Sequence, residues 1–142
     1  MRFEQSISIA AAPQLPWDVL TDAEHSPEWT STMTSVKRLD NGPFGIGSEV
    51  RIEQPRLPTA TWTVTECDPP TYFAWESTRP GVRSVAGHRI EPSGEGCVVT
   101  LSIEQAGPLA PLAGLLYGRL IRRYLETEAT SLKARCQSHA RR

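Results

Sequence analysis

The chain has 142 residues, the usual size of one domain, and we expect residues 1–142 to form a single domain. Fifteen basic and sixteen acidic residues leave a formal net charge of −1, so we expect no nucleic-acid partner. The longest apolar region, residues 109–117, is much shorter than the roughly 20 residues of a membrane span. The first residues lack the apolar stretch of a signal peptide, and together these features predict a cytoplasmic protein without a membrane span.

The residues that most often bind metals do not cluster in this sequence. The three cysteines are widely spaced and odd in number, which argues against a disulfide framework or a structural zinc site: Cys67, Cys97 and Cys136. We expect them to be buried free thiols that pack as small apolar groups. The three histidines have no metal-ligand spacing, and no glycine-rich phosphate loop is present. We therefore predict neither a metal nor a cofactor.

The N-terminal third begins with a strand and two short helical segments. Phe3, Ile7 and Ile9 alternate with polar residues, which is the period of two of a half-buried strand. A proline at position 13 followed by residues 17–20 predicts a short helix, and a second helical turn is expected around residues 25–29.

Residues 36–105 are predicted to be a succession of strands. Alternating apolar residues, separated by segments rich in glycine and proline, indicate strands at 48–54, 61–65, around 73–75, at 84–91 and at 97–105. Residues 93–96 (SGEG) are typical of a hairpin turn. Short connections between successive strands predict an antiparallel meander.

A long C-terminal helix is predicted from Pro111 to about residue 138, a length of roughly 40 Å. At 100° per residue its apolar face holds Leu112, Leu116, Leu120 and Tyr124, with Ile121, Leu125, Leu132 and Cys136 beside it and Arg119, Arg122 and Arg123 on the solvent side. An apolar arc this wide predicts a helix held against a curved sheet. Glu128 and Arg135 fall at the edge of this arc, where we expect solvated or paired charges, or residues that guard one end of a pocket.

Short segments spread over the whole chain carry a family resemblance. They are residues 7–10 (ISIA), 12–13 (AP), 17–22 (WDVLTD), 27–29 (PEW), 45–48 (GIGS), 62–66 (WTVTE), 69–70 (PP), 73–75 (FAW), 88–92 (HRIEP) and 94–96 (GEG). In this order they resemble the START-like helix-grip superfamily, and within it the SRPBCC group with its polyketide cyclase/dehydrase and lipid-transport family. The resemblance implies an α+β fold. A curved antiparallel sheet of about seven strands would wrap around the C-terminal helix, and two short helices would follow the first strand.

Inward-pointing side chains of such a fold enclose an apolar pocket. The inward members of the strand alternations and the apolar face of the C-terminal helix predict these ligand contacts: Ile52, Gln54, Trp62, Phe73, Trp75, His88, Ile90, Leu101, Leu116, Tyr117, Leu120 and Tyr124. Trp29, which follows a short helical corner, is expected to cap the cavity mouth and contact the ligand there. The alternative is that these residues fill a solid core. The tryptophans in particular are common packing residues, and Trp29 would then be a plug beneath the first helices.

His88 is the candidate for chemistry because it shares a strand face with Ala86 and Ile90. An inward imidazole can orient a ligand carbonyl or hydroxyl, or act as a general acid or base. Tyr124, Tyr117 and Ser77 are the nearest candidates to assist it, and Tyr124 is the one we select as a second catalytic residue. The alternative is a core histidine that is satisfied by a neighbouring group.

Three functions are compatible with this pattern. The first is the binding of a hydrophobic small molecule, such as a lipid, a polyketide or an aromatic metabolite, by a monomer or homodimer. The second is an enzyme similar to a polyketide cyclase or dehydratase, with His88 as its acid/base. The third is an interaction or stress-response module without a ligand, which would expose an apolar patch on its surface.

Overall fold

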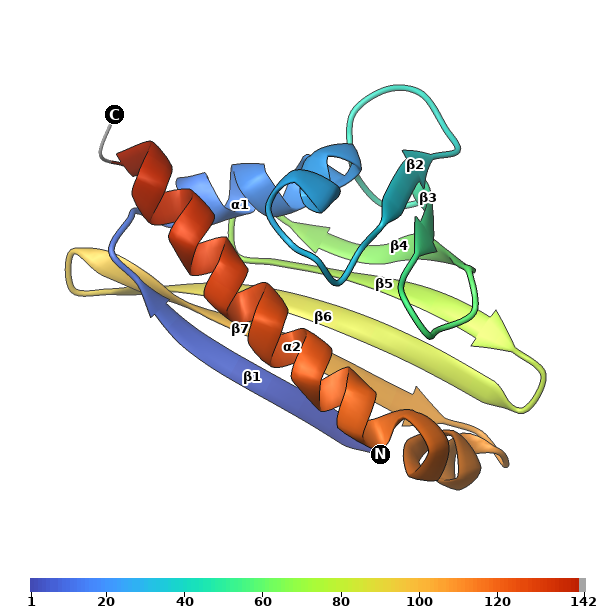
Figure 1. Ribbon diagram of the computed structural model, residues 1–142. Coiled ribbons are helices and arrows are strands. Elements are labelled where there is room, and N and C mark those ends of the chain that lie inside the picture. The colour runs from blue at the N-terminus through green and yellow to red at the C-terminus, as the bar shows by residue number, and fades with distance from the viewer. Residues whose placement is uncertain (141–142) are drawn as a thin grey trace.

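The computed structural model describes residues 1–140, which form a seven-stranded sheet, two short helices and a long C-terminal helix (Figure 1). In chain order the elements are β1 (Arg2–Ile9), α1 (Gln14–Thr21), the 3-10 helix η1 (Ala23–Glu28), β2 (Ser35–Arg38), β3 (Glu49–Glu53), β4 (Ala60–Asp68), β5 (Tyr72–Arg79), β6 (Val82–Ser93), β7 (Gly96–Ala106) and α2 (Ala110–Ala140). The predicted α+β helix-grip fold is confirmed.

The sheet is antiparallel throughout, with strand order β1-β7-β6-β5-β4-β3-β2. Strands β2 to β7 follow one another as hairpins, and β1 closes the sheet beside β7. At the β6–β7 turn Ser93 pairs with Gly96, and Gly94 adopts a φ of 59°, a conformation that such a tight hairpin turn requires.

Buried and exposed side chains alternate along the strands as predicted. In β3, Val50 and Ile52 are buried while Glu49 and Arg51 are exposed. In β6, His88 is buried and its neighbour Arg89 is exposed. Because side chains alternate along a strand, a shift of one residue would have turned His88 outward.

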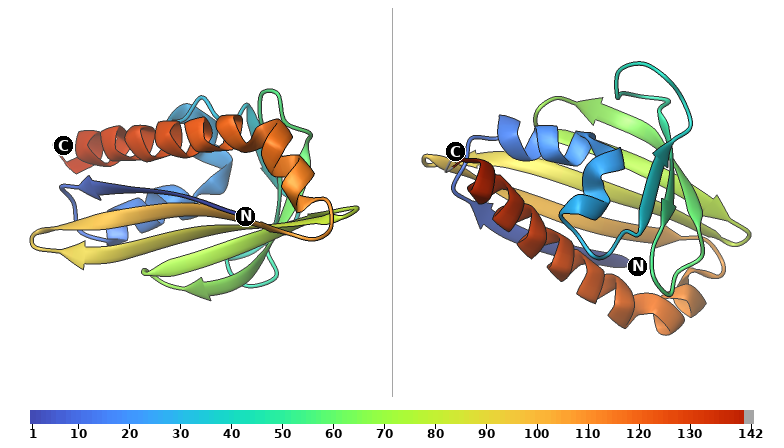
Figure 2. Two further views of the ribbon diagram at one scale, coloured as in Figure 1. Left: turned by 90° about the horizontal axis from the view of Figure 1, so that it is seen from below. Right: turned by 45° about the horizontal axis from the view of Figure 1, so that its top comes forward.

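Two glycines of α2 face the N-terminal end of the chain and β1. A methyl group at Gly114 would overlap the Met1 side chain, and one at Gly118 would lie 3.5 Å from the Phe3 ring. The helix therefore lies along β1, in a layer of its own over the sheet (Figure 2). None of the helices in residues 1–140 combines the length and apolar character needed to cross a bilayer.

This contact rotates α2 relative to our prediction. The fully buried stripe is the set that we expected at the side of the apolar arc, namely Ile121, Leu125, Leu132 and Cys136, together with Ala129. The leucines that we placed at the centre of the apolar face, Leu112 and Leu116, are exposed. These two leucines lie in the wall of the cavity where it opens to solvent, rather than in the core.

A close contact also joins the start of α2 to the β5–β6 turn. The Leu109 N–H donates a hydrogen bond to the Gly81 carbonyl at 2.9 Å. Gly107 has a φ of 109°, and a Cβ there would lie 2.5 Å from the Gly81 oxygen. Only glycine fits this position without strain, and the contact fixes Leu109 beside the turn.

A substitution at Leu132 tests which face of α2 packs against the sheet. This leucine is fully buried, so Leu132→Ala should lower the free energy of unfolding by about 2–5 kcal/mol through lost burial and a residual cavity. The same change at the exposed Leu115 is the control and should cost less than about 0.5 kcal/mol in urea unfolding. Equal losses at the two positions would contradict the helix orientation described above.

Candidate functional site

A cavity of about 370 Å³ lies between the sheet and α2. Its size falls within the range of small-molecule pockets, about 300–1,000 Å³. The apolar part of its wall comes from β3 to β7 and from α2: Ile52, Trp62, Trp75, Ala86, Leu101, Ile103, Ile121 and Leu125. Because α2 packs mainly on β1 and β7, the space over the middle strands is left for the cavity.

The cavity extends along β6 from His88 at its inner end to Val82 at its mouth. Six residues of strand separate these two positions, which corresponds to about 20 Å. Beyond His88, Ile90 and its cross-strand partner Val99 are fully buried and belong to the core. The inner end is therefore closed by packed side chains, and the other end reaches the surface.

Most of the residues predicted to contact a ligand are in the cavity wall. They are Ile52, Gln54, Trp62, Trp75, His88, Leu101, Leu116, Tyr117 and Tyr124. Their placement makes contact with a ligand sterically possible, and their role in binding stays a prediction.

Four predicted contacts are not in the wall: Trp29, Phe73, Ile90 and Leu120. Phe73 and Ile90 are on the inner face of the sheet as expected, but α1 covers that end, and Trp17 packs edge-to-face on Phe73 at 5.7 Å. Trp29 packs against the same core, in agreement with its alternative role as a plug. Leu120 is only partly buried and lies outside the cavity wall because of the rotation of α2.

The imidazole of His88 is held by two aromatic rings and one backbone carbonyl. Its ring stacks on Phe73 at 4.0 Å with an interplanar angle of 8°, and Trp75 approaches edge-on at 5.2 Å. Its Nδ1 lies 3.2 Å from the Phe73 carbonyl oxygen. A carbonyl can only accept a hydrogen bond, so Nδ1 carries the proton and Nε2 of the neutral ring is an acceptor.

Burial makes His88 a weak base. It lowers the pKa of His88 to about 4, and the hydrogen bond to Phe73 offsets this only in part. The ring is therefore neutral at pH 7, and it removes protons less readily than an exposed histidine does. The geometry suits an imidazole that accepts a hydrogen bond from a ligand hydroxyl better than one that acts alone as a general base.

Glu128, which we expected to be either a solvated or paired charge or a residue at one end of a pocket, lies in the cavity wall. Its side chain is partly exposed, but its carboxyl group is surrounded by protein and accepts a hydrogen bond from the Thr32 hydroxyl at 2.9 Å. Burial raises the pKa of Glu128 to about 7, while the Thr32 hydrogen bond acts in the opposite direction. In the sequence, this residue stands out as a carboxylate between Leu125 and Leu132, two residues of the stripe of α2 that is buried in the structure.

Tyr124 links α2 to the segment between β3 and β4. Its hydroxyl donates a hydrogen bond to the Pro55 carbonyl oxygen, so the phenolic proton points to the backbone. Arg79 donates to the Thr59 carbonyl of the same segment. Tyr124 thus has a structural contact at the cavity, and its catalytic role stays a prediction.

Glu128→Gln should reveal the titration of the buried carboxyl. Its pKa is higher in the folded chain than in the unfolded one, so its stabilising contribution is complete below about pH 4.3 and is lost as the pH rises through about 7. In urea titrations, the free energy of unfolding of the wild type, compared with that of Glu128→Gln, should therefore fall as the pH is raised from about 4.3 to about 7. Glu126→Gln, on the exposed side of α2, is the control. A wild-type advantage that grows with pH would contradict the assignment.

Comparisons with known proteins agree with this architecture. Uncharacterized proteins of Mycobacterium bovis and Mycobacterium tuberculosis are 25% identical over 115 residues, which cover 77% of this chain and 69% of theirs. The fold is similar to that of the Zhui aromatase/cyclase from Streptomyces sp. R1128, with a TM-score of 0.76, 19% identity and coverage of 99% and 95% of the two chains. It is also similar to the protein TTHA0849 from Thermus thermophilus, with a TM-score of 0.77, 17% identity and coverage of 98% and 99%. The family model for polyketide cyclase/dehydrase and lipid transport proteins matches residues 1–137, and the chain belongs to this family.

Proposed function

We propose that the protein binds a small, mostly apolar molecule in the cavity between the sheet and α2. The observation that carries this proposal is the cavity itself, about 370 Å³ in volume and bounded largely by aromatic and aliphatic side chains. Burial of apolar ligand surface in such a site contributes roughly 25 cal/mol per Å². Trp62 and Trp75 in the wall favour a ligand with flat apolar surface.

The ligand that fits best carries a hydroxyl group near its buried end. His88 offers Nε2 as an acceptor at neutral pH, at the inner end of the cavity. Glu128 offers a carboxyl group that is both donor and acceptor when protonated. A lipid, an aromatic metabolite or a polyketide with one hydroxyl group would satisfy these groups without bringing a formal charge into the cavity.

The cavity residue Ser77 allows a steric test of binding. Ser77→Phe should fill part of the cavity and weaken binding by about tenfold or more, whereas Thr78→Phe on the exposed side of β5 should not. Native mass spectrometry of the purified protein would detect a retained compound. Titration with 2-naphthol and a fatty acid, followed by tryptophan fluorescence, would measure uptake, because two of the four tryptophans, Trp62 and Trp75, are in the cavity wall. An empty protein that takes up neither compound would overturn the proposal.

A second candidate function is acid/base catalysis on the bound molecule, as in a cyclase or dehydratase. It is favoured by two ionisable groups in one cavity wall whose pKa values are shifted in opposite directions, to about 4 for His88 and about 7 for Glu128. Proton transfer at neutral pH is most efficient with a pKa near 7. Glu128 would therefore exchange the proton, and His88 would hold the substrate oxygen.

Two variants separate catalysis from binding. The compound that mass spectrometry identifies would be incubated with the wild type, Glu128→Gln and His88→Ala, and conversion would be followed by chromatography. A catalytic Glu128 predicts a loss of turnover of about 10²–10⁴-fold in Glu128→Gln with binding retained. Conversion unaffected by both changes, in variants that still fold, would exclude this catalytic assignment. Bound compound that no form of the protein converts would leave binding as the function.

A further inference from the structure

The start of α2 exposes an unusual group of leucines. Leu109, Leu112, Leu115 and Leu116 are 47%, 51%, 81% and 66% exposed. Three of them, Leu109, Leu112 and Leu116, also line the cavity, so the apolar surface surrounds its mouth. Contiguous exposed apolar side chains on a protein surface mark sites of interaction. We call these four leucines the leucine patch.

Other residues at the mouth continue this apolar surface. Leu57 and Pro58 come from the segment between β3 and β4, and Pro80 comes from the β5–β6 turn. The two prolines are exposed, and Leu57 is partly exposed. A ligand that enters the cavity from this side therefore passes a ring of apolar side chains. No other part of residues 1–140 covers this ring.

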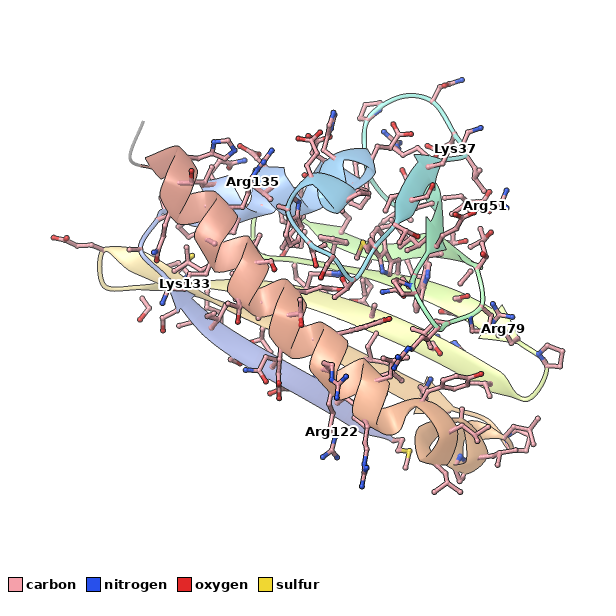
Figure 3. The ribbon with its side chains drawn as sticks, viewed as in Figure 1. Lys37, Arg51, Arg79, Arg122, Lys133 and Arg135 are labelled. Atoms are coloured by element: carbon pink, nitrogen blue, oxygen red, sulfur yellow. The ribbon has the colours of Figure 1, made fainter. Side chains whose placement is uncertain are left out.

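Exposed arginines follow the leucine patch along the same helix. Arg119, Arg122 and Arg123 lie seven residues after Leu112, Leu115 and Leu116 respectively, about two turns further along α2 and past the bend near the start of this helix (Figure 2). No acidic residue occurs between positions 106 and 125. Among the described residues, none of these arginines forms an ion pair, and the Arg122 guanidinium lies over the Phe3 ring, 5.3 Å from its centroid. Figure 3 shows Arg122 projecting from α2 near this end of the helix.

We propose that the leucine patch docks on an anionic lipid bilayer, with the three arginines at the level of the lipid phosphates. Seven helical residues span about 10 Å along the axis. With the N-terminal end of α2 directed toward the bilayer, the arginines therefore lie about 10 Å behind the leucines, which can then reach below the headgroups. Docking in this way places the cavity mouth against the membrane. An apolar ligand then passes between bilayer and cavity without crossing water.

Electrostatics favours the bilayer over a second copy of the chain as the partner that covers the leucine patch. A twofold contact through the leucine patch brings the arginines of both copies together when the helices run parallel and leaves them in water when they run antiparallel. Residues 106–125 supply no carboxylate to pair with them, and the first one in α2 is Glu126. An anionic membrane surface instead attracts each of these arginines. In this arrangement the bilayer covers the leucines, and its phosphates lie next to the arginines.

Sedimentation with lipid vesicles tests the proposal on the whole chain. The wild type should bind vesicles of phosphatidylcholine mixed with phosphatidylglycerol much more tightly than phosphatidylcholine alone. Arg119→Gln/Arg123→Gln should weaken this binding by about 30-fold. Leu115→Gln, which lies outside the cavity wall, should weaken it by roughly tenfold.

Matched variants elsewhere on the surface are the controls. Lys37→Gln/Arg51→Gln removes two charges from β2 and β3, which lie far from Arg122 in Figure 3. Ile46→Gln removes an apolar side chain that is 72% exposed. These variants should bind mixed vesicles within about twofold of the wild type, because neither site belongs to the docking surface.

Two outcomes would overturn the proposal. The first is no binding to mixed vesicles, or equal losses in the test and control variants. The second is a dimer in light scattering that Leu115→Gln converts to a monomer without any vesicle binding by the wild type. The vesicles contain no added ligand, so a protein that fails to take up ligand can still dock, and the two proposals fail separately.

Discussion

The close approach of α2 to β1 is the contact on which the cavity depends. The helix packs mainly on β1 and β7, with Gly114 facing Met1 and Gly118 facing Phe3. Held at this side of the sheet, it does not cover the middle strands, and the curved sheet leaves a volume that side chains do not fill. The register of β6 then turns His88 toward this volume.

Charge is distributed unevenly between the inside of the cavity and its surroundings. Burial lowers the pKa of His88 to about 4 and raises that of Glu128 to about 7, so both groups favour their neutral forms, as a low-dielectric environment requires. The arginines of the first half of α2 are in water. The same helix thus presents an almost uncharged face to the cavity and a cationic face to the solvent.

The fold and the strand faces were predictable because both depend on local patterns. Alternation placed Val50, Ile52 and His88 correctly on the inner face. Alternation does not show where along a strand the core ends and the cavity begins. Phe73, which belongs to the core, could therefore not be distinguished from Trp75, which is in the cavity wall. The difference arises because α1 covers the end of the sheet at Phe73. Glu128 was placed at the edge of the apolar arc, where a solvated charge and a pocket residue could not be told apart, because the sequence does not fix the rotation of α2 about its axis.

The three sides of the cavity mouth are held with unequal strength. The β5–β6 turn and the start of α2 are joined through backbone, by the Leu109–Gly81 hydrogen bond and the tight packing of Gly107. The segment between β3 and β4 is held by side-chain donors, Tyr124 to Pro55 and Arg79 to Thr59. Two sides of the mouth are therefore joined through the backbone, and the third is tied to its neighbours by side chains. Loss of the Tyr124 and Arg79 donors would release residues 54–59 while leaving the other two sides joined.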